Sequence, residues 1–387
     1  MTTMADNKDK KVLNVPHLRF PEFSGEWEET TLGKISEITK GSGISKDQLS
    51  EQGSPCILYG ELYTKYKSEI IDVLYSRTEL ESSSLVKSKA NDVIIPCSGE
   101  TAIDISTARC VPFNNILLGG DLNIIRLKHD DGGFFAYQLN GARKKDIARV
   151  AQGVSVVHLY GENLKHIRVY HPAIEEQKKI TRLLSLMDER IATQNKIIED
   201  LKLLKSAIAE TVFNNMKGHL TNLSAICNIV KGKQVNGEEL SEKGKYYVMN
   251  GGMTPSGYYD QCNTPANTIS VSEGGNSCGY VQYNKSSFWS GGHCYTLQDI
   301  TSGVDTQYLF HYLKRYESNI MNLRIGTGLP NIQKKDLENF RITLPPSNVQ
   351  KEISTCLTAI EDKIMVEVKW LDSAQKERLY LLRQMFI

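Results

Sequence analysis

"NLKHIRVYHPAIEEQKKI" (Asn163–Ile180), in the middle of the chain, recurs near its end as "DLENFRITLPPSNVQKEI" (Asp336–Ile353). An offset of 173 residues separates Pro172 from Pro345, and the same offset aligns the two halves from about residue 130 onward. A repeat on this scale indicates a fold that is built twice from one plan.

A second repeated segment lies earlier in each half. "TTLGKISEITKG" (Thr30–Gly41) matches "TNLSAICNIVKG" (Thr221–Gly232) at an offset of 191 residues. Between the matching segments the two sequences differ, and the change of offset makes the first middle longer. Each half therefore consists of segments common to both halves that flank an insert whose sequence differs between them.

Each repeat ends in a pattern that predicts a long helix. Pro172 precedes the first pattern and Pro345-Pro346 the second, and proline suits the first turn of a helix. Apolar residues follow at heptad spacing. This seam comprises Ile180, Leu184, Met187, Ile191, Ile198, Leu201 and Ile208 in the first repeat, and Ile353, Leu357, Ile360, Ile364, Leu371 and Leu381 in the second.

The matching seams predict that Ile174–Asn214 and Ser347–Ile387 pack against each other as an antiparallel coiled coil. Two alternatives stay open at this point. The helices could form a coiled coil with a partner chain, or each could pack on the core of its own domain.

The globular regions show short β-type runs followed by a helical pattern, which predicts mixed α/β domains, two per chain. The expected strands are Cys56–Gly60, Asp92–Pro96, Leu122–Leu127, Thr268–Ser272 and Cys294–Leu297. The expected helices are Leu309–Leu323 and, more weakly patterned, Phe135–Val150. The expected organisation is a polar tail (1–15), domain 1 (16–172), helix 1 (173–216), domain 2 (217–345) and helix 2 (346–387).

Composition narrows the class of protein. The 387 residues carry a net charge of only +1, so bulk attraction cannot be the basis for binding a polyanion. The polar opening "MTTMADNKDKK" lacks the apolar core of a signal peptide, and no apolar run reaches membrane-spanning length, which predicts a cytoplasmic protein. The eight cysteines form no C-x-x-C pair, which favours buried thiols over a zinc site.

Sequence marks of catalysis on nucleic acid are absent. The chain contains no phosphate-binding G-x-x-x-x-G-K-[ST] loop and no G-x-G-x-x-G after a strand. "PCSGET" (Pro96–Thr101) and "GGHC" (Gly291–Cys294) offer a Ser, a His and two Cys, but neither forms a nucleophile elbow. We therefore expect no catalytic residue, no metal site and no cofactor in this chain.

The segments "VPHLRFPEFSGEWEETTLGKISEITKGSGIS" (Val15–Ser45) and "LPNIQKKDLENFRITLPPSNVQKEI" (Leu329–Ile353), with the two matching helices, carry a family resemblance. The chain resembles the specificity (S) subunit of type I restriction-modification systems, which act in DNA methylation and phage defence. The resemblance covers essentially the whole chain after the polar tail.

The resemblance implies that each domain is a target recognition domain that reads one half of a split DNA sequence. It implies that the helices set the spacing and dock two methyltransferase subunits, which bring S-adenosylmethionine and the adenine-modifying site. Two restriction subunits would add ATP- and magnesium-dependent cleavage. The chain itself would be non-catalytic.

One departure from the family concerns the end of the chain. Ile387 is level with Asn214 of the first helix, so a tail that closes the frame in relatives would have to be replaced by Val12–Trp27.

Base reading in the major groove favours planar donors and acceptors and small hydroxyls, and such residues follow the expected strands. The candidates in domain 1 are Lys40, Ser42, Tyr59, Glu61, Ser98, Glu100, Thr101, Lys144, Lys145, Arg149 and Gln152. The candidates in domain 2 are Lys231, Lys233, Gln234, Asn250, Ser272, Glu273, Asn276, Tyr280, Arg315, Arg324, Thr327 and Asn331. For each of them, an ordinary solvated side chain is the alternative.

Two other functions remain open from sequence. The first is a structural adaptor whose coiled coil assembles proteins and whose paired domains bind proteins rather than DNA. The second is a hydrolase, which the missing catalytic motifs disfavour.

Overall fold

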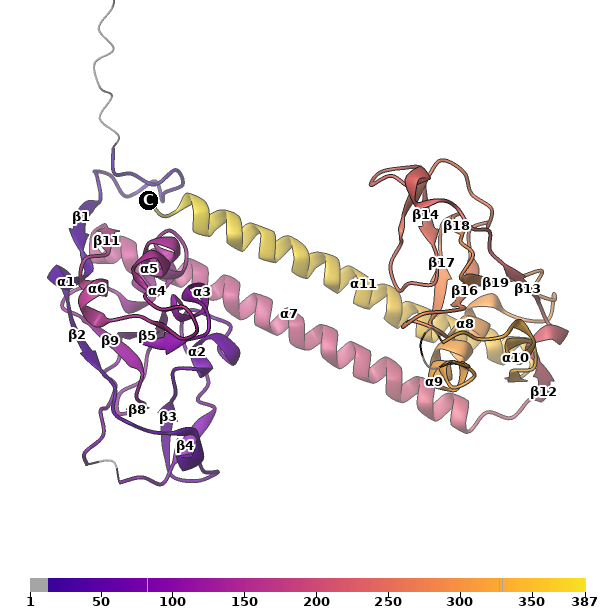
Figure 1. Ribbon diagram of the computed structural model, residues 1–387, viewed down its shortest axis with the longest axis horizontal. Coiled ribbons are helices and arrows are strands. Elements are labelled where there is room, and N and C mark those ends of the chain that lie inside the picture. The colour runs from indigo at the N-terminus through magenta and orange to yellow at the C-terminus, as the bar shows by residue number, and fades with distance from the viewer. Residues whose placement is uncertain (1–12, 82, 327, 329) are drawn as a thin grey trace, which may run out of the picture. The chain divides into compact units, whose positions relative to one another are not determined.

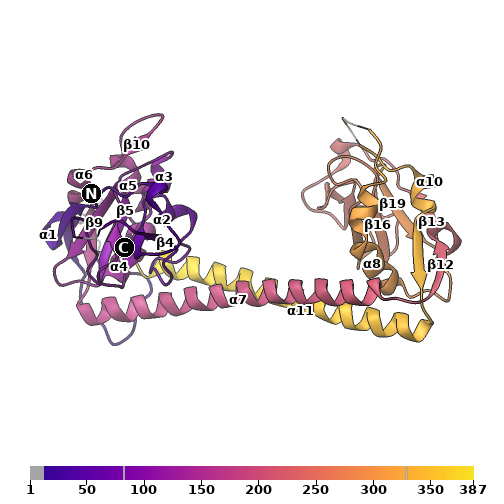
Figure 2. The ribbon, with the colours of Figure 1, turned by 90° about the horizontal axis from the view of Figure 1, so that it is seen from below.

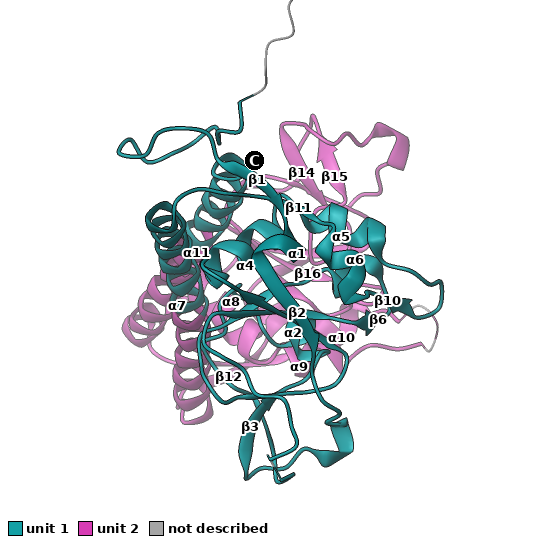
Figure 3. Ribbon diagram, turned by 90° about the vertical axis from the view of Figure 1, so that its left-hand side faces the viewer, with its two compact units in different colours: residues 1–195, 370–387 teal, residues 196–369 magenta. Residues whose placement is uncertain are grey.

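The computed structural model describes residues 13–81, 83–326, 328 and 330–387. The polar tail expected over residues 1–15 lies mostly outside these residues. The chain divides into two compact units, Met1–Asn195 with Trp370–Ile387, and Lys196–Lys369 (Figure 3). Each unit consists of a globular domain and parts of the long helices α7 (Ile174–Asn214) and α11 (Ser347–Gln384).

Short strands and helices make up the domain of the first unit (Figure 1). Its strands are β1 (Glu28–Thr31), β2 (Ser36–Lys40), β3 (Ser54–Ile57), β4 (Ser76–Thr78), β5 (Asp92–Pro96), β6 (Ser98–Gly99), β7 (Arg109–Val111), β8 (Leu117–Leu118), β9 (Leu122–Leu127), β10 (Val157–His158) and β11 (Arg168–His171). Its helices are α1 (Leu32–Ile35), η1 (Lys46–Gln48), α2 (Glu61–Thr64), α3 (Ala102–Ile105), α4 (Gly132–Asn140), α5 (Lys144–Val150) and α6 (Gly161–Lys165).

The domain of the second unit has the same kinds of element. Its strands are β12 (His219–Asn222), β13 (Asn228–Lys231), β14 (Tyr246–Met249), β15 (Gly257–Tyr259), β16 (Thr268–Ser272), β17 (Val281–Asn284), β18 (Trp289–Ser290), β19 (Cys294–Gln298) and β20 (Arg341–Leu344). Its helices are η2 (Leu223–Ala225), η3 (Gly237–Glu239), α8 (Thr306–Arg315), α9 (Glu317–Met321) and α10 (Lys334–Glu338).

The repeat in the sequence is a repeat in sheet topology. The main sheet has the order β2-β9-β5-β7 in the first domain and β13-β19-β16-β17 in the second. A smaller sheet accompanies each, β4-β3-β8 and β15-β14-β18. An antiparallel pair joins the start and end of each domain, with Glu28 opposite His171 in β1–β11 and His219 opposite Leu344 in β12–β20.

The two long helices run in opposite directions within each unit (Figures 1 and 2). In the first unit the guanidinium of Arg190 in α7 lies 4.4 Å from the ring centre of Trp370 in α11. In the second unit Lys205 of α7 forms an ion pair with Glu361 of α11 at 3.1 Å. Every residue of the expected seam is buried or half-buried, with Ile180, Leu184, Ile198 and Leu357 the most fully covered.

One glutamine fixes the start of each long helix to its domain. Gln177 is 1% exposed; its Nε2 donates to the carbonyl of Pro172 (2.9 Å) and its Oε1 accepts from the N–H of Asp131 (2.9 Å). Gln350, the repeat equivalent, donates to the carbonyl of the matching proline (2.9 Å) and accepts from the N–H of Asp305 (2.9 Å). Asp131 and Asp305 are the N-caps of α4 and α8, so each glutamine ties two helix starts together.

The N-terminal segment lies against the last turn of α11. The N–H of Leu18 donates to the carbonyl of Gln384 at 2.8 Å. Trp27, which is buried, packs edge-on against Phe134 and Phe386 with ring centres 5.5 Å and 6.4 Å away. In the second unit Phe213, the repeat equivalent of Phe386, packs against aromatic residues of α8.

Two kinds of feature are missing from the described residues. No helix among them combines the length and the apolar character that crossing a membrane requires. No group of three or more His, Cys, Asp or Glu side chains in the described part of the chain is placed to hold a metal ion.

Candidate nucleic-acid interface

Two glycine motifs meet at one edge of each main sheet. A Cβ added to Gly41 would overlap the carbonyl oxygen of Gly119, and a Cβ added to Gly232 would overlap that of Gly291. Only glycine permits this approach of two backbones. The contact places the Lys-Gly sequence that ends β2 or β13 beside the Gly-Gly sequence that precedes β9 or β19.

In the first domain this edge gathers the chain segments that follow β2 and β5 and precede β9. The strands are antiparallel neighbours, so the end of β2, the end of β5 and the start of β9 share one edge. Gly41 N–H donates to the carbonyl of Leu122 (3.0 Å), and Cys97 N–H donates to that of Asp121 (2.6 Å). Lys40 and Asp121 are both exposed there.

Several predicted residues of the first domain flank this edge. β6, which contains Ser98, pairs with β10, and Gln152 forms a bridge with His158 of β10. Glu100 is exposed, and the hydroxyl of Thr101 accepts from Asp104 N–H (3.1 Å) as the N-cap of α3. α5 lies against α3 and carries the predicted residues Lys144, Lys145 and Arg149.

A cavity of about 780 Å³ opens between the same loops, with Tyr59, Lys46 and Asp121 in its lining. Glu61 also lines it, but its carboxylate is held by Lys65 Nζ (2.6 Å), Ser76 Oγ (2.5 Å) and the N–H of Leu58. The predicted residue Ser42 is likewise engaged, since its hydroxyl accepts from Val86 N–H (2.8 Å). The side chains of Glu61 and Ser42 therefore hold the loops in which they lie in place.

In the second domain the equivalent edge holds a buried carboxylate. Glu273 is 8% exposed, and its Oε1 accepts from Lys231 Nζ (2.6 Å) and from the hydroxyl of Tyr295 (3.0 Å). Its Oε2 has no hydrogen-bond partner among the described residues. His293 Nδ1 lies 3.8 Å away from it, on an exposed ring. The site therefore keeps one unused acceptor beside a lysine and a histidine.

The other predicted residues of the second domain divide into two groups. Asn250 accepts from His293 N–H (3.1 Å), and Ser272 donates to the carbonyl of Gly251 (2.6 Å), so both lie at this edge. Asn331 also lies there, since it bridges to Gly274. Lys233, Gln234, Asn276 and Arg324 are exposed.

Two predicted residues point elsewhere. The guanidinium of Arg315 faces Glu210 of α7 at 3.5 Å, and the ring of Tyr280 lies under Lys314 Nζ at 3.9 Å. Thr327 lies outside the described residues.

The thiols of this edge are not ionised at neutral pH. Burial raises the pKa of Cys97 to about 11, although the charge of Lys40 lowers it in part. Burial also raises the pKa of Cys294 to about 11. The two motifs considered for a nucleophile therefore present no thiolate.

Asp121 and His293 were not among the predicted residues. Each follows a Gly-Gly pair and immediately precedes a buried strand, in "GGDL" (Gly119–Leu122) and "GGHC" (Gly291–Cys294). That shared pattern could have identified them, because it occurs at equivalent places of both repeats.

Comparisons with known proteins identify the family. The family model for the type I restriction modification DNA specificity domain matches residues 24–203 and again residues 220–371. The chain is 33% identical over 283 residues to a protein of Mycoplasma pneumoniae assigned as a type I specificity subunit. This match spans 69% of this chain and 71% of that protein. It is 31% identical over 153 residues to a similarly assigned protein of Mycoplasma genitalium, and the match spans 39% of this chain and 40% of that protein.

A solved structure shares the fold. The crystal structure of a type I restriction-modification system S subunit from Mycoplasma genitalium superposes with a TM-score of 0.76 at 19% identity, over 96% of this chain and 99% of that chain. The matches confirm the expected mixed α/β domains, and they favour DNA recognition over the adaptor and the enzyme. The chain belongs to the family of type I restriction-modification DNA specificity proteins and contains two copies of the specificity domain.

Proposed function

We propose that the chain is the non-catalytic specificity subunit of a type I complex, and that each domain reads one half of a split DNA target. The first target recognition domain would span residues 16–172 and the second 217–345, with the helical segments 173–216 and 346–387 as spacers. The predicted residues at the two sheet edges, together with Asp121 and His293, would face the bases and the DNA backbone.

One observation carries this proposal. The same sheet edge holds a lysine and a carboxylate in both domains: Lys40 and Asp121, whose charges both act on Cys97, and Lys231 bonded to Glu273. The lysines belong to the segments that match between the repeats, and the sequences between those segments differ. Lysine donates to guanine, and carboxylates accept from the amino group of cytosine. Two domains with the same scaffold and different loops are suited to reading two unrelated half-sites.

The long helices support a role in assembly. Apolar side chains remain exposed on both helices outside the seam, and a partner subunit would cover them. These residues are Leu186, Ile197, Leu203 and Leu204 on α7, and Met365, Val366, Val368, Leu379 and Tyr380 on α11. We assign these side chains to contacts with two methyltransferase subunits.

The proposed complex implies which subunits bind the cofactors and where the complex acts. S-adenosylmethionine would bind to the methyltransferase subunits, and ATP with magnesium to two restriction subunits where these accompany them. The complex would act on DNA in the cytoplasm.

Co-expression with the methyltransferase subunits, followed by mapping of methylated adenines in the host genome, tests the proposal. A methylated motif with two defined halves and an undefined spacer is the expected result. Exchanging the loops of one domain should alter one half only. A stable complex that methylates no motif, or a continuous motif, would contradict the proposal.

A further inference from the structure

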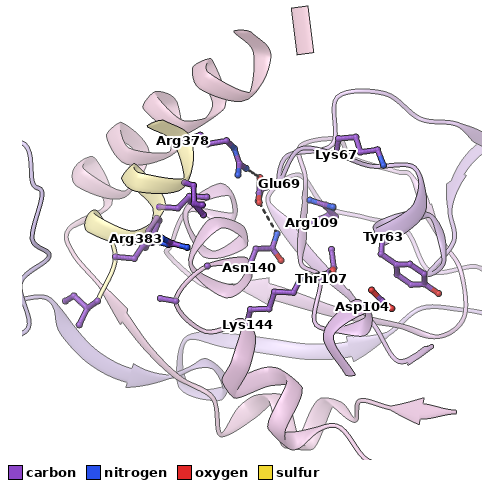
Figure 4. A pocket seen from close by; sticks show the side chains of 16 residues that line it. Tyr63, Lys67, Glu69, Asp104, Thr107, Arg109, Asn140, Lys144, Arg378 and Arg383 are labelled. Carbon is purple, nitrogen blue, oxygen red and sulfur yellow. Dashed lines mark hydrogen bonds and ion pairs between the residues drawn. The ribbon is translucent and has the colours of Figure 1, made fainter. Parts of the chain in front are cut away.

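A second cavity in the first unit, away from the paired sheet-edge motifs, has a volume of about 730 Å³ (Figure 4). Its wall comes from the last turns of α11, the junction of α4 and α5, the segment after α2, and α3 with the loop that follows it. Five cationic side chains line it, Lys67, Arg109, Lys144, Arg378 and Arg383. Among the described residues, the side chains of Glu69 and Asp104 bring carboxylates to its lining, and Ile387 also lines it, with its terminal oxygen accepting a hydrogen bond from Arg143.

Both carboxylates already have partners. Glu69 pairs with the guanidinium of Arg378, as the dashed line in Figure 4 marks. Asp104 accepts a hydrogen bond from the hydroxyl of Thr101 at 2.6 Å. Lys67, Lys144 and Arg383 form no ion pair with either carboxylate, although the charges of Asp104 and Glu69 act on Lys144.

Arg109 is the deepest of these cations. It is 7% exposed, and its guanidinium donates to the carbonyl oxygens of Leu62 (3.0 Å), Tyr66 (2.8 Å) and Ser68 (2.9 Å). Carbonyl dipoles disperse its positive charge but do not cancel it. The wall of the cavity thus holds a fixed positive charge.

Three of the other cations around it, unlike Arg378, lack strong partners among the described residues. Lys144 Nζ donates there only to the hydroxyl of Thr107, at 3.4 Å, and its pKa is lowered by burial and then by repulsion from Arg109. Lys67 and Arg383 are exposed, and neither side chain has a hydrogen bond or ion pair with another described residue. A bound anion would satisfy all three side chains.

The repeat shows that the frame does not require these charges. Lys144 is equivalent to Glu317 of the second half, and Arg383 is equivalent to Glu210. Glu317 pairs with Lys314 (2.6 Å) and Glu210 faces Arg315 (3.5 Å), so the second unit neutralises its own charges at these positions. At these two positions the second unit has carboxylates where the first unit has cations.

We propose that this cavity binds a phosphate group through Lys67, Lys144 and Arg383. Phosphate oxygens accept hydrogen bonds from several directions, which suits lysine and arginine donors that come from separate elements. The phosphate is supplied either by the DNA backbone next to the half-site of the first domain or by a free phosphate compound. The DNA source rests on the proposed function; the binding of phosphate does not.

The test uses the double variant Lys67→Gln/Arg383→Gln, because both side chains are exposed and the fold does not depend on them. Lys89→Gln, an exposed lysine before β5 and outside the cavity, is the matched control. In the first arm, the DNA affinity of the complex with methyltransferase subunits is measured as a function of salt. The slope of log K against log salt should fall by about 0.9 for each DNA phosphate that the variant no longer neutralises, equally on target and scrambled DNA.

In the second arm, inorganic pyrophosphate is titrated into the isolated chain in a calorimeter. We expect binding to the wild type and to Lys89→Gln, and binding at least about tenfold weaker to the double variant. A reduced slope in the first arm assigns the site to the DNA backbone. An unchanged slope with weakened pyrophosphate binding assigns it to a free phosphate compound.

If neither the slope nor pyrophosphate binding changes in the double variant, the inference is overturned. A wild-type complex that shows no target-specific DNA binding would instead refute the proposed function. The pyrophosphate titration would then decide the inference by itself.

Discussion

The guanidinium of Arg378 in α11 is hydrogen-bonded to the carboxylate of Asp188 in α7. The same guanidinium pairs with Glu69 of the first domain, and the hydroxyl of Tyr137 in α4 donates to Asp188 Oδ2 at 2.6 Å. One arginine thus connects both long helices to the domain. The equivalent pair in the second unit is Lys205 with Glu361.

Replacing Arg378 by alanine should lower the free energy of unfolding of the first unit by about 3 kcal/mol or more, because two largely buried carboxylates lose their counter-ion. Lys205→Ala, the matched control, should cost less than about 1 kcal/mol, since Glu361 is 35% exposed while Asp188 is 11% exposed. Urea unfolding of both variants measures the difference. Equal decreases in stability would show that burial of the pair does not set its contribution.

Gln177→Ala and Gln350→Ala should each destabilise one unit by about 1–3 kcal/mol, because each leaves a backbone N–H and a proline carbonyl without its partner. Hydrogen exchange locates the effect. Gln177→Ala should speed exchange at the N–H of Asp131 and leave that of Asp305 unchanged, and Gln350→Ala should do the reverse. Simultaneous loss of protection at both amides would indicate that the units unfold as one.

The elements common to both domains were predictable because their sequence segments occur twice in the chain. Strands β5, β9 and β16 have the predicted bounds; β5 and β16 are buried along their whole length, and β9 is buried over its first four residues. The inserts whose sequences differ between the two halves were less predictable. The strand expected over Cys56–Gly60 ends at Ile57, because the carboxylate of Glu61 accepts from the N–H of Leu58 and turns the chain into α2.

Side-chain partners across strands were the least predictable feature. Lys231 and Glu273 are 42 residues apart, and only the register of β13, β19 and β16 brings them together. The helix expected over Leu309–Leu323 is interrupted at Tyr316, where Glu317 instead accepts from the N–H of Val281 in β17. Such pairings depend on tertiary contacts that periodicity does not encode.

His311 should make the stability of the second unit depend on pH. Burial, with a smaller effect of the charge of Lys205, lowers the pKa of His311 to about 3, whereas the pKa of a histidine in an unfolded chain is about 6.5. Between these values the unfolded chain binds more protons, so this stability is fully present above pH ~6.5 and is lost as pH falls toward about 3.

His311→Gln, which installs the residue found at the equivalent position 138, should remove this dependence. The stability difference between wild type and variant should shrink by up to about 1.4 kcal/mol per pH unit on acidification. His171 gives a contrast of opposite sign, because its hydrogen bond to Asp130 raises its pKa. Its contribution is present below pH ~6.5 and is lost as pH rises through the raised pKa. Parallel pH profiles for wild type and His311→Gln would contradict the assignment.

Glu273→Gln should change the base preference at one position of the second half-site. An ionised carboxylate only accepts hydrogen bonds, and the Oε2 of Glu273, which is buried, has no partner among the described residues; the amino group of a cytosine that reaches it would supply one. Glutamine has the same shape but adds a donor, and such a change in pairing alters discrimination between bases by about 1–3 kcal/mol. Mapping of methylated motifs in cells that express the variant measures the change.

Asp121→Asn in the first domain is the matched control, because Asp121 is a carboxylate at the equivalent sheet edge of that domain. It should alter the first half-site and leave the second unchanged, while Glu273→Gln does the opposite. The separation of the two effects matters more than their size, because loss of folding or of assembly with the methyltransferase would abolish both halves together. A variant that weakens methylation equally at every site would show that Glu273 supports the loop around Lys231 and does not contact a base.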